Sequence, residues 1–393
     1  MVSGTNPSLN PRLAKVAGVL SQLDWQVDVF CPCIVPALKE EDEALANAGG
    51  WRIIRYFDWE GSKARLVFER ATRKAADILN RRLQFESAYS LGYGMFSGLR
   101  PLLPRLSTYD LMIGHQEVGL WAGMRIRENL PVWIDIEDWY SRDLLPEALP
   151  GRPVGLLQNM ERLALTKAKL CTTTTKAMAQ ALHHAYGGVE PAVLYNTFKG
   201  GGKPSWQDRA QGSVVSFHWF SQTIGRGRGL GVLLQAIKLL PDLQFEVHLR
   251  GRLGCEDWLR RQLDEKSDPK LILHPLVSNQ ELDQRIAEHD VGLALEPTIP
   301  DNKNLTASNK IFHYLVNGLD VIATRTKGQV EVAKLAGEGR MTLVDQNDAE
   351  ALAAAMRAAI CRGPRQLTRE LPTELTFVGF VKRAEQLAAG LVE

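Results

Sequence analysis

The stretch that decides the fold begins as "SVVSFHW" (213–219) and continues as "FSQTIGRGRGLGVLLQAI" (220–237). A β-rich apolar run leads into a glycine-rich turn, and a helix follows the turn. The helix is predicted by apolar residues at helical spacing, which mark its buried face: Leu230, Leu233, Leu234 and Ile237. A strand, a glycine-rich turn and a helix in this order are typical of the ligand-binding edge of an open α/β sheet.

The glycine-rich turn has the composition of an anion site. Free backbone N–H groups and the positive end of a helix attract negative charge, and Gly225, Gly227 and Gly229 let a ligand approach the backbone. Arg228 can form paired hydrogen bonds with phosphate oxygens, and Arg226 adds a second guanidinium. The pattern matches neither a Walker loop nor the G-x-G-x-x-G fingerprint, so a structural turn with solvated arginines is the alternative.

Short β-rich runs alternate with helical patterns along the whole chain. They lie at 26–30, 51–57, 110–114, 131–135, 169–174 and 192–195, and again at 213–219, 243–249, 270–274, 290–296, 320–324 and 341–344. Strands that alternate with helices of about 10–15 residues predict crossover connections and parallel sheets. Two such series predict two doubly wound, Rossmann-like α/β domains.

The two series are separated by "NTFKGGGKPSWQDRAQG" (196–212), which is rich in glycine and charge and has no periodicity. We therefore expect an N-terminal domain over 1–197, a C-terminal domain over 198–375 and a closing helix over 376–393. The front of the chain, "MVSGTNPSLNPRL" (1–13), leaves little room before the first loop. Either the first strand is very short or the chain starts late.

Composition excludes several classes of protein. Hydrophobic residues make up 45% of the chain and charged residues 23%, as in soluble globular proteins, and the net charge of +2 gives no indication of nucleic-acid binding. No apolar run reaches the roughly 18 residues of a membrane span, and no leader pattern stands at the front. The five cysteines lack zinc-type pairing, which favours a reduced, cytoplasmic protein.

A second polar edge is predicted within "LEPTIPDNKNLTASNKIFHYLVNGLDVIAT" (295–324). A strand ends at Glu296, and Ser308 is the expected N-cap of the next helix. Lys310 then lies in a first helical turn, where a cation opposes the helix dipole, so a bound anion would offset that cost. A solvated lysine and an exposed loop glutamate are the alternatives.

Residues 62–105 form a basic segment, with nine Lys or Arg residues against three acidic ones. Aromatic residues are interleaved with these charges. The segment is either a solvated helix pair or a surface that binds an anionic membrane or an anionic acceptor.

The motifs "WFSQTIGRGRGL" (219–230) and "SNKIFHYLVNGLDVIAT" (308–324) together resemble the bacterial GT-B glycosyltransferases of the family-4 type, which are retaining and use nucleotide sugars. "NPRLAKVAGVL" (10–20) resembles their first helix, while "IGHQE" (113–117) and "DIEDWYS" (135–141) resemble their interdomain-facing loops. The resemblance covers nearly the whole chain and implies two Rossmann-like domains that face each other across a cleft, an N-terminal acceptor domain (1–197) and a C-terminal nucleotide-sugar domain (198–375).

The resemblance also implies roles for individual residues. Arg228 and Lys310 would bind the donor diphosphate during catalysis, and His115 would lie near the reacting sugar unless it is only a hydrogen-bonded histidine at a strand end. The other implied donor contacts are Gln222, Gly225, Arg226, Gly227, Gly229, Glu296, Ser308, Asn309 and His313. The implied acceptor contacts are Asn10, Arg12, Glu117, Asp135 and Glu137.

The chain departs from the family pattern at several positions. Many relatives carry two glutamates eight positions apart at the donor ribose and sugar, where this chain has Leu305 and His313. Gln222 replaces a second basic residue, and Asp320 replaces a proline. Glu296 is a candidate replacement for one of the two glutamates.

The implied reaction transfers a sugar from a UDP- or GDP-linked donor to a hydroxyl of a glycan, a lipid-linked molecule or a protein, in the synthesis of bacterial envelope glycans. Cations and backbone N–H groups would stabilise the leaving diphosphate, so we expect no metal and no cofactor besides the nucleotide sugar. The protein would be cytoplasmic or peripheral on the inner face of the membrane. Two alternatives are a non-catalytic GT-B scaffold or activator and, much less favoured, a nicotinamide dehydrogenase, because the first loop lacks the glycine fingerprint.

Overall fold

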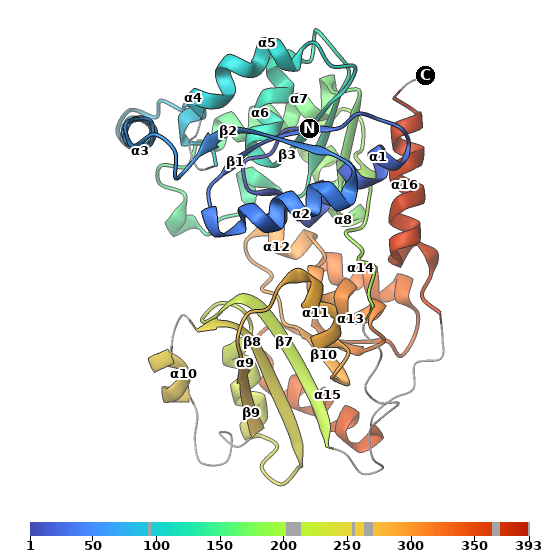
Figure 1. Cartoon of the computed structure of the whole chain (residues 1–393). Helices are drawn as coiled ribbons and strands as arrows, with labels where there is room; N and C mark the ends of the chain where they lie inside the picture. The colour runs from blue at the N-terminus through green and yellow to red at the C-terminus, as the bar shows by residue number, and fades with distance from the viewer. Residues whose placement is uncertain (93–95, 202–213, 254–255, 263–269, 364–369, 392–393) are drawn as a thin grey trace. The chain divides into compact units, whose positions relative to one another are not determined.

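The computed structural model describes residues 1–92, 96–201, 214–253, 256–262, 270–363 and 370–391. The chain forms two compact units (Figure 1). Unit 1 comprises Met1–Leu194 and Val381–Glu393, and unit 2 comprises Tyr195–Phe380. Cys255 and most of the predicted linker (202–212) lie outside the described residues.

Unit 1 is built around parallel strands. They are β1 Asp28–Cys33, β2 Arg52–Asp58, β3 Met112–His115, β4 Val132–Ile136, β5 Leu170–Thr173 and β6 Ala192–Val193. Its longer helices are α1 Pro11–Gln22, α2 Lys39–Gly49, α3 Lys63–Leu83, α6 Gln116–Ile126, α7 Val154–Lys167 and α8 Lys176–Tyr186, and its short ones are α4 Phe96–Leu99 and α5 Leu103–Leu106.

A single residue joins the two groups of strands in unit 1. Strands β1 and β2 pair with each other, and β3, β4, β5 and β6 pair in that order. Val2 makes parallel bridges to Phe30 of β1 and to Gly114 of β3. The first strand of this unit therefore consists of one bridging residue, which agrees with the expectation of a very short first strand.

Unit 2 has a six-stranded parallel sheet in the order β12-β11-β10-β7-β8-β9. Its strands are β7 Val215–Ile224, β8 Phe245–Leu253, β9 Leu271–His274, β10 Val291–Ala294, β11 Asp320–Thr324 and β12 Met341–Val344. Its helices are α9 Leu230–Lys238, α10 Glu256–Gln262, α11 Asn279–Ile286, α12 Asp301–Leu305, α13 Asn309–Val316, α14 Lys327–Ala336 and α15 Ala349–Arg362, while α16 Phe377–Ala389 spans the boundary between the units.

The strand order of unit 2 reverses between β7 and β10, which pair directly. Ligands of doubly wound sheets bind beyond the carboxyl ends of the strands at such a reversal. The apolar residues of α9 are buried together with β7, as its helical spacing predicts, and α15 packs on α9. The prediction of Rossmann-like parallel sheets is confirmed, with a strand at each of the twelve predicted positions.

Candidate functional site

The glycine-rich turn of unit 2 connects β7 to α9 at the point where the strand order reverses. Its first residue, Gly225, is buried, whereas Gly227 and Gly229 both have a φ of +76°, a left-handed conformation that favours glycine. A Cβ atom at Gly229 would lie 2.3 Å from the Cβ of Leu295. This close approach explains why the residue before α9 has no side chain.

Both arginines of the turn are exposed and held at the sheet edge. The Nη1 of Arg228 donates to the Oγ of Ser221 at 2.9 Å. Ser221 lies where the β7–β8 pairing changes register after Phe220, together with the exposed Gln222. The guanidinium of Arg226 lies 5.9 Å from the ring centre of Trp258. Each arginine thus has one anchoring contact and remains accessible to a ligand.

Glu296, Ser308 and Lys310 form a second polar group at the same edge. The Nζ of Lys310 lies 2.5 Å from Oε1 of Glu296, and the Ser308 hydroxyl donates to the same oxygen at 2.9 Å. Burial acts to raise the pKa of Glu296, but Lys310 and Ser308 outweigh it and lower that pKa to about 2. The Lys310 ammonium also lies 5.8 Å from the ring centre of Trp219, which helps to hold it in place.

Ser308 is the N-cap residue of α13, as its position predicted. Its side chain makes no capping bond, however, and its hydroxyl donates to Glu296. Its neighbour Asn309 is exposed and accepts a hydrogen bond from Asn196 at 2.8 Å. The structure therefore assigns the Ser308 side chain to the placement of Glu296 and not to the helix end.

The two positions where relatives carry glutamates are buried in unit 2. Leu305 is 6% exposed and His313 is 8% exposed. The Nδ1 of His313 lies 2.8 Å from Oδ1 of Asp283, and its ring stacks on Phe198 at 3.7 Å between centres. His313 is thus held among protein groups, and Glu296 is the carboxylate that lies beside Lys310.

Several of these groups surround one cavity of about 240 Å³. Its lining includes Arg226, Gly227, Gly229, Glu296, Thr324 and Asp348. This volume is below the roughly 300–1,000 Å³ of pockets that enclose whole small-molecule ligands. The cavity is therefore too small to enclose a whole ligand of that size.

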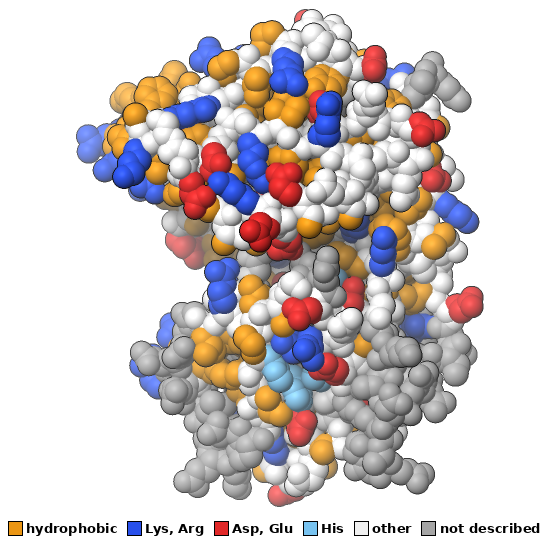
Figure 2. All heavy atoms as spheres, viewed as in Figure 1, with side chains coloured by type: hydrophobic (Ala, Val, Ile, Leu, Met, Phe, Trp, Pro, Cys, Tyr) orange, Lys and Arg blue, Asp and Glu red, His pale blue; other side chains and the backbone are white. Residues whose placement is uncertain are grey.

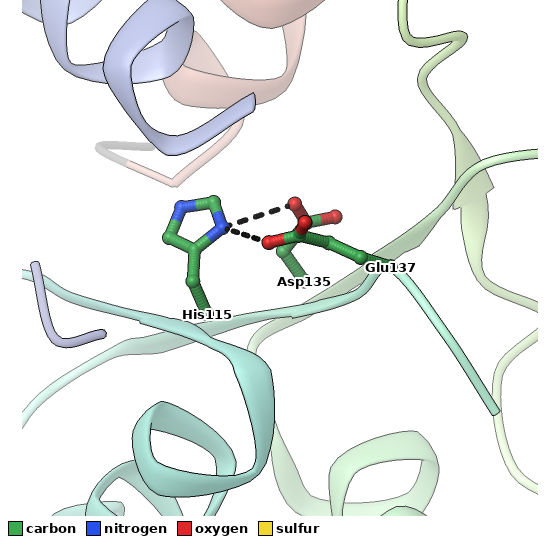
Figure 3. Close-up of side chains that lie close together, drawn as sticks. All are labelled: His115, Asp135 and Glu137. Carbon is green, nitrogen blue, oxygen red and sulfur yellow. Dashed lines mark hydrogen bonds and ion pairs between the residues drawn. The ribbon is translucent and has the colours of Figure 1, made fainter. Parts of the chain in front are cut away.

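A different arrangement occupies the carboxyl edge of unit 1. His115 ends β3 and pairs in register with Asp135 of β4. Its Nδ1 lies 2.9 Å from Oε1 of Glu137 and 3.2 Å from Oδ2 of Asp135 (Figure 3). Burial alone would lower the pKa of His115, but the hydrogen bonds to both carboxylates outweigh burial and raise it. This histidine is therefore held as an imidazolium over a wider pH range than a free one.

The start of α1 fixes the two carboxylates. The Arg12 guanidinium bonds both oxygens of Asp135 at 2.5 and 2.7 Å, and the Thr172 hydroxyl donates to Asp135 at 2.6 Å. Asn10 donates to Glu137 at 2.9 Å and also caps α1. The side chains of Arg12 and Asp135 are each 1% exposed. As placed, Arg12 and Asp135 position His115, and their role as acceptor contacts stays a prediction.

Glu117 lies apart from this group, although it follows His115 closely in sequence. Its carboxylate accepts from the backbone N–H of Gly92 and from the Arg152 guanidinium. Sequence reasoning missed Gln116, which has a φ of +60° and accepts hydrogen bonds from Ser3, Gly4 and Thr5. A left-handed residue other than glycine beside a candidate site is a sign of function, but no sequence pattern reports it.

His115, Asp135 and Glu137 also have donor atoms within 4.8 Å of one another, a spacing that a metal ion can use. Imidazole and carboxylate donors suit zinc or manganese. Both oxygens of Asp135, however, already accept bonds from Arg12 or Thr172. A metal would compete with a buried guanidinium for this carboxylate, which disfavours metal binding in the described arrangement.

Comparison with known proteins gives one family match, in the second half of the chain. Residues 219–362 match the family model described as glycosyl transferases group 1, a segment that includes the glycine-rich turn, Glu296 and Lys310. No curated protein has a significantly similar sequence.

Solved structures are similar over nearly the full chain. Sucrose-phosphate synthase of Thermosynechococcus elongatus has a TM-score of 0.63 at 13% identity, with 100% of this chain and 95% of that chain covered. Anabaena Alr3699/HepE in complex with UDP has a TM-score of 0.61 at 15% identity, covering 99% and 93%. The lipopolysaccharide outer core galactosyltransferase WaaB has a TM-score of 0.54 at 10% identity, covering 97% and 94%. The chain therefore has the GT-B fold, and the family match in its second unit supports a glycosyltransferase.

Proposed function

We propose that the protein transfers a sugar from a nucleoside-diphosphate donor to an acceptor hydroxyl, with the donor diphosphate bound at the carboxyl edge of unit 2. The observation that carries this proposal is the content of the segment 219–362. It matches a glycosyltransferase family and contains both cationic parts of the edge, the turn with Arg228 and the pair of Lys310 with Glu296.

The chemistry follows from the charges. As the bond between the sugar and the diphosphate breaks, negative charge gathers on the leaving phosphate, and prearranged cations and N–H groups stabilise it. Arg228 and Lys310 supply the cations, and the turn from Gly225 to Gly229 supplies backbone N–H groups. Glu296 positions the Lys310 ammonium, and Ser221 positions Arg228.

His115 would contact the sugar. Its Nδ1 bonds to Glu137 and Asp135, while its buried Nε2 has no hydrogen-bond partner in the described part of the protein. With a raised pKa, the ring is an N–H donor on both sides. In a retaining transfer, the leaving phosphate accepts the acceptor proton on the same face, so His115 orients the sugar and does not attack it.

We propose UDP as the first nucleotide to test and GDP as the second. Anabaena Alr3699/HepE has been solved in complex with UDP and glucose, and S. aureus MnaA with UDP, which supports this order. The acceptor would be a glycan, a lipid-linked molecule or a protein in bacterial envelope synthesis. Transfer would retain the anomeric configuration and need no metal.

A thermal-shift screen with UDP, GDP, ADP, CMP and dTDP tests the donor site, and sugar-linked forms of each stabilising nucleotide then test turnover. A ligand present at 100 times its dissociation constant stabilises a protein by about 2.7 kcal/mol. The proposal predicts one or two stabilising nucleotides. It is wrong if none stabilises the protein and no nucleotide sugar turns over. The configuration of the product, read by NMR, tests retention separately.

The second candidate function is a non-catalytic GT-B subunit that binds and activates a partner enzyme. It is favoured by the two positions at which relatives carry glutamates. This chain has the buried Leu305 at one of them and His313, which bonds Asp283, at the other. Nucleotide binding without turnover of any donor, together with a faster partner glycosyltransferase, would identify this function.

A further inference from the structure

Helix α3 of unit 1 buries polar residues and exposes apolar ones. Its inward face carries Glu69, Ala76 and Asn80, which are 2%, 5% and 9% exposed. The Glu69 carboxylate accepts from the backbone N–H of Ser97 at 2.9 Å, and the Asn80 amide donates to the carbonyl of Gly151 at 3.0 Å. Polar contacts therefore attach this helix to the unit, although helices of globular proteins bury their apolar face.

The apolar side chains of α3 face solvent. Val67 is 66% exposed, Phe68 53%, Ile78 43%, Leu79 40% and Leu83 70%. At 3.6 residues per turn, they share one broad side of the helix with the exposed Ala64, Ala71, Ala75 and Arg82, and this side adjoins the face that carries the polar anchors. Just beyond the helix, Phe85 is 61% exposed and extends the same surface. An apolar face of this length in contact with water marks an interaction surface.

Basic residues border this apolar face. Lys63, Arg70, Lys74 and Arg81 are exposed and recur on one flank of the helix. Of the two acidic residues in α3, Glu69 is buried and Asp77 lies 4.0 Å from Arg73. Figure 2 shows hydrophobic and basic side chains together at the edge of unit 1 where α3 lies. The charge around the apolar face is therefore almost entirely positive.

We propose that α3 is an interfacial helix that docks unit 1 on an anionic membrane surface. Its apolar side chains would enter the boundary between headgroups and acyl chains, while the basic flank would bind the headgroups. A second copy of the chain fits this surface poorly, because a symmetric contact would bring two basic flanks together. None of the described helices is long and apolar enough to cross a membrane, so the contact is peripheral.

Vesicle co-sedimentation of the full chain tests the proposal. Vesicles of phosphatidylcholine alone are compared with vesicles that also contain phosphatidylglycerol, at low and high salt. We expect roughly tenfold tighter binding to the anionic vesicles at low salt, and loss of most of this difference at high salt. Equally weak binding to both vesicle types at low salt would overturn the proposal.

Variants matched by exposure locate the surface. Val67→Ser with Leu83→Ser should reduce binding to anionic vesicles about tenfold, because both side chains lie on the apolar face of α3. The matched control is Val189→Ser with Ile299→Ser, since these side chains are 73% and 62% exposed elsewhere, and it should bind like the parent. Equal losses in both double variants would mean that exposed apolar area in general, and not α3, binds lipid.

The charges are tested in the same way. Lys63→Gln with Lys74→Gln should weaken binding and reduce its salt dependence, whereas Lys167→Gln with Lys334→Gln should not. Sedimentation equilibrium without lipid tests whether a second copy of the chain binds α3 instead. A dimer of the parent protein that dissociates in Val67→Ser with Leu83→Ser would make α3 a contact between copies and overturn the membrane assignment. Turnover of a water-soluble acceptor should be equal in all variants, so the proposed membrane contact and the proposed transfer reaction are tested separately.

Discussion

The two units place different charged groups at the carboxyl edges of their parallel sheets. At the carboxyl edge of unit 1, two carboxylates surround a buried histidine, whereas the edge of unit 2 carries Arg226, Arg228 and the pair of Lys310 with Glu296. The parallel sheet determines where a site forms, and the residues that follow the strand ends determine its chemistry. A sugar with its hydroxyls suits the first edge, and a diphosphate suits the second.

Buried histidines show the same contrast. His115 in unit 1 and His218 in unit 2 are both 0% exposed. The pKa of His115 is raised because its carboxylate partners outweigh burial, whereas burial lowers the pKa of His218, reinforced by Arg250, His248 and His274. Two equally buried histidines thus have pKa values shifted in opposite directions, because the neighbouring carboxylates of His115 outweigh the effect of burial.

The largest effect is expected from His115→Ala. Loss of a prearranged donor at the proposed sugar site should lower kcat about 10²–10³-fold, while donor affinity should change little because the proposed diphosphate site lies in unit 2. Steady-state kinetics and calorimetry with the donor nucleotide separate these quantities. A variant with unchanged kcat would show that His115 is only a hydrogen-bonded residue at a strand end.

Arg228→Ala and Lys310→Ala test the basic edge. Each removes a charge-assisted bond worth about 1.5–3 kcal/mol, so nucleoside-diphosphate affinity should fall roughly ten- to a hundredfold. Lys334→Ala, on the exposed side of α14, is the matched control and should bind normally. Calorimetry that finds parent-like affinity in both edge variants would refute the phosphate assignment, provided that thermal unfolding shows them folded.

The opposite pKa changes of the two histidines predict opposite pH effects on stability. His218 is neutral in the folded protein but protonates near pH 6.5 when unfolded, so its share of stability is lost as pH falls below that value. His115 contributes stability below pH 6.5 that is lost as pH rises through its raised folded pKa. A tenfold difference in proton affinity between the folded and unfolded states corresponds to about 1.4 kcal/mol of stability.

Thermal unfolding between pH 5 and 8 measures these effects in single variants. His218→Leu should lose less stability than the parent on acidification, and His115→Gln should lose less on alkalinisation. If the dependence of stability on pH is the same in both variants as in the parent, the opposite pKa shifts of His115 and His218 are contradicted.

Much of the fold could be predicted from sequence, because short β-rich runs alternate with helices. Polar residues that directly follow these runs in the sequence are expected at the carboxyl edge of a sheet. The glycine-rich turn and Lys310 are predicted as site residues in this way. Contacts between residues far apart in sequence could not be predicted, such as the bond from His313 to Asp283. The outward apolar face of α3 is a second example: helical spacing reveals two faces, but only the distant partners of Glu69 and Asn80 decide which turns inward.

The smallest expected effect is that of a chelator, which sharpens the contrast between the edges. EDTA should leave turnover unchanged, because Arg228, Lys310 and backbone N–H groups would balance the diphosphate at the proposed site, and Arg12 bonds both oxygens of Asp135. Turnover is measured before and after chelation and again after addition of manganese. Complete loss in EDTA with recovery in manganese would contradict this prediction. Glu137→Gln would then show whether the metal binds with His115 and Asp135, since removal of one ligand should raise the manganese concentration needed for recovery about 10- to 100-fold.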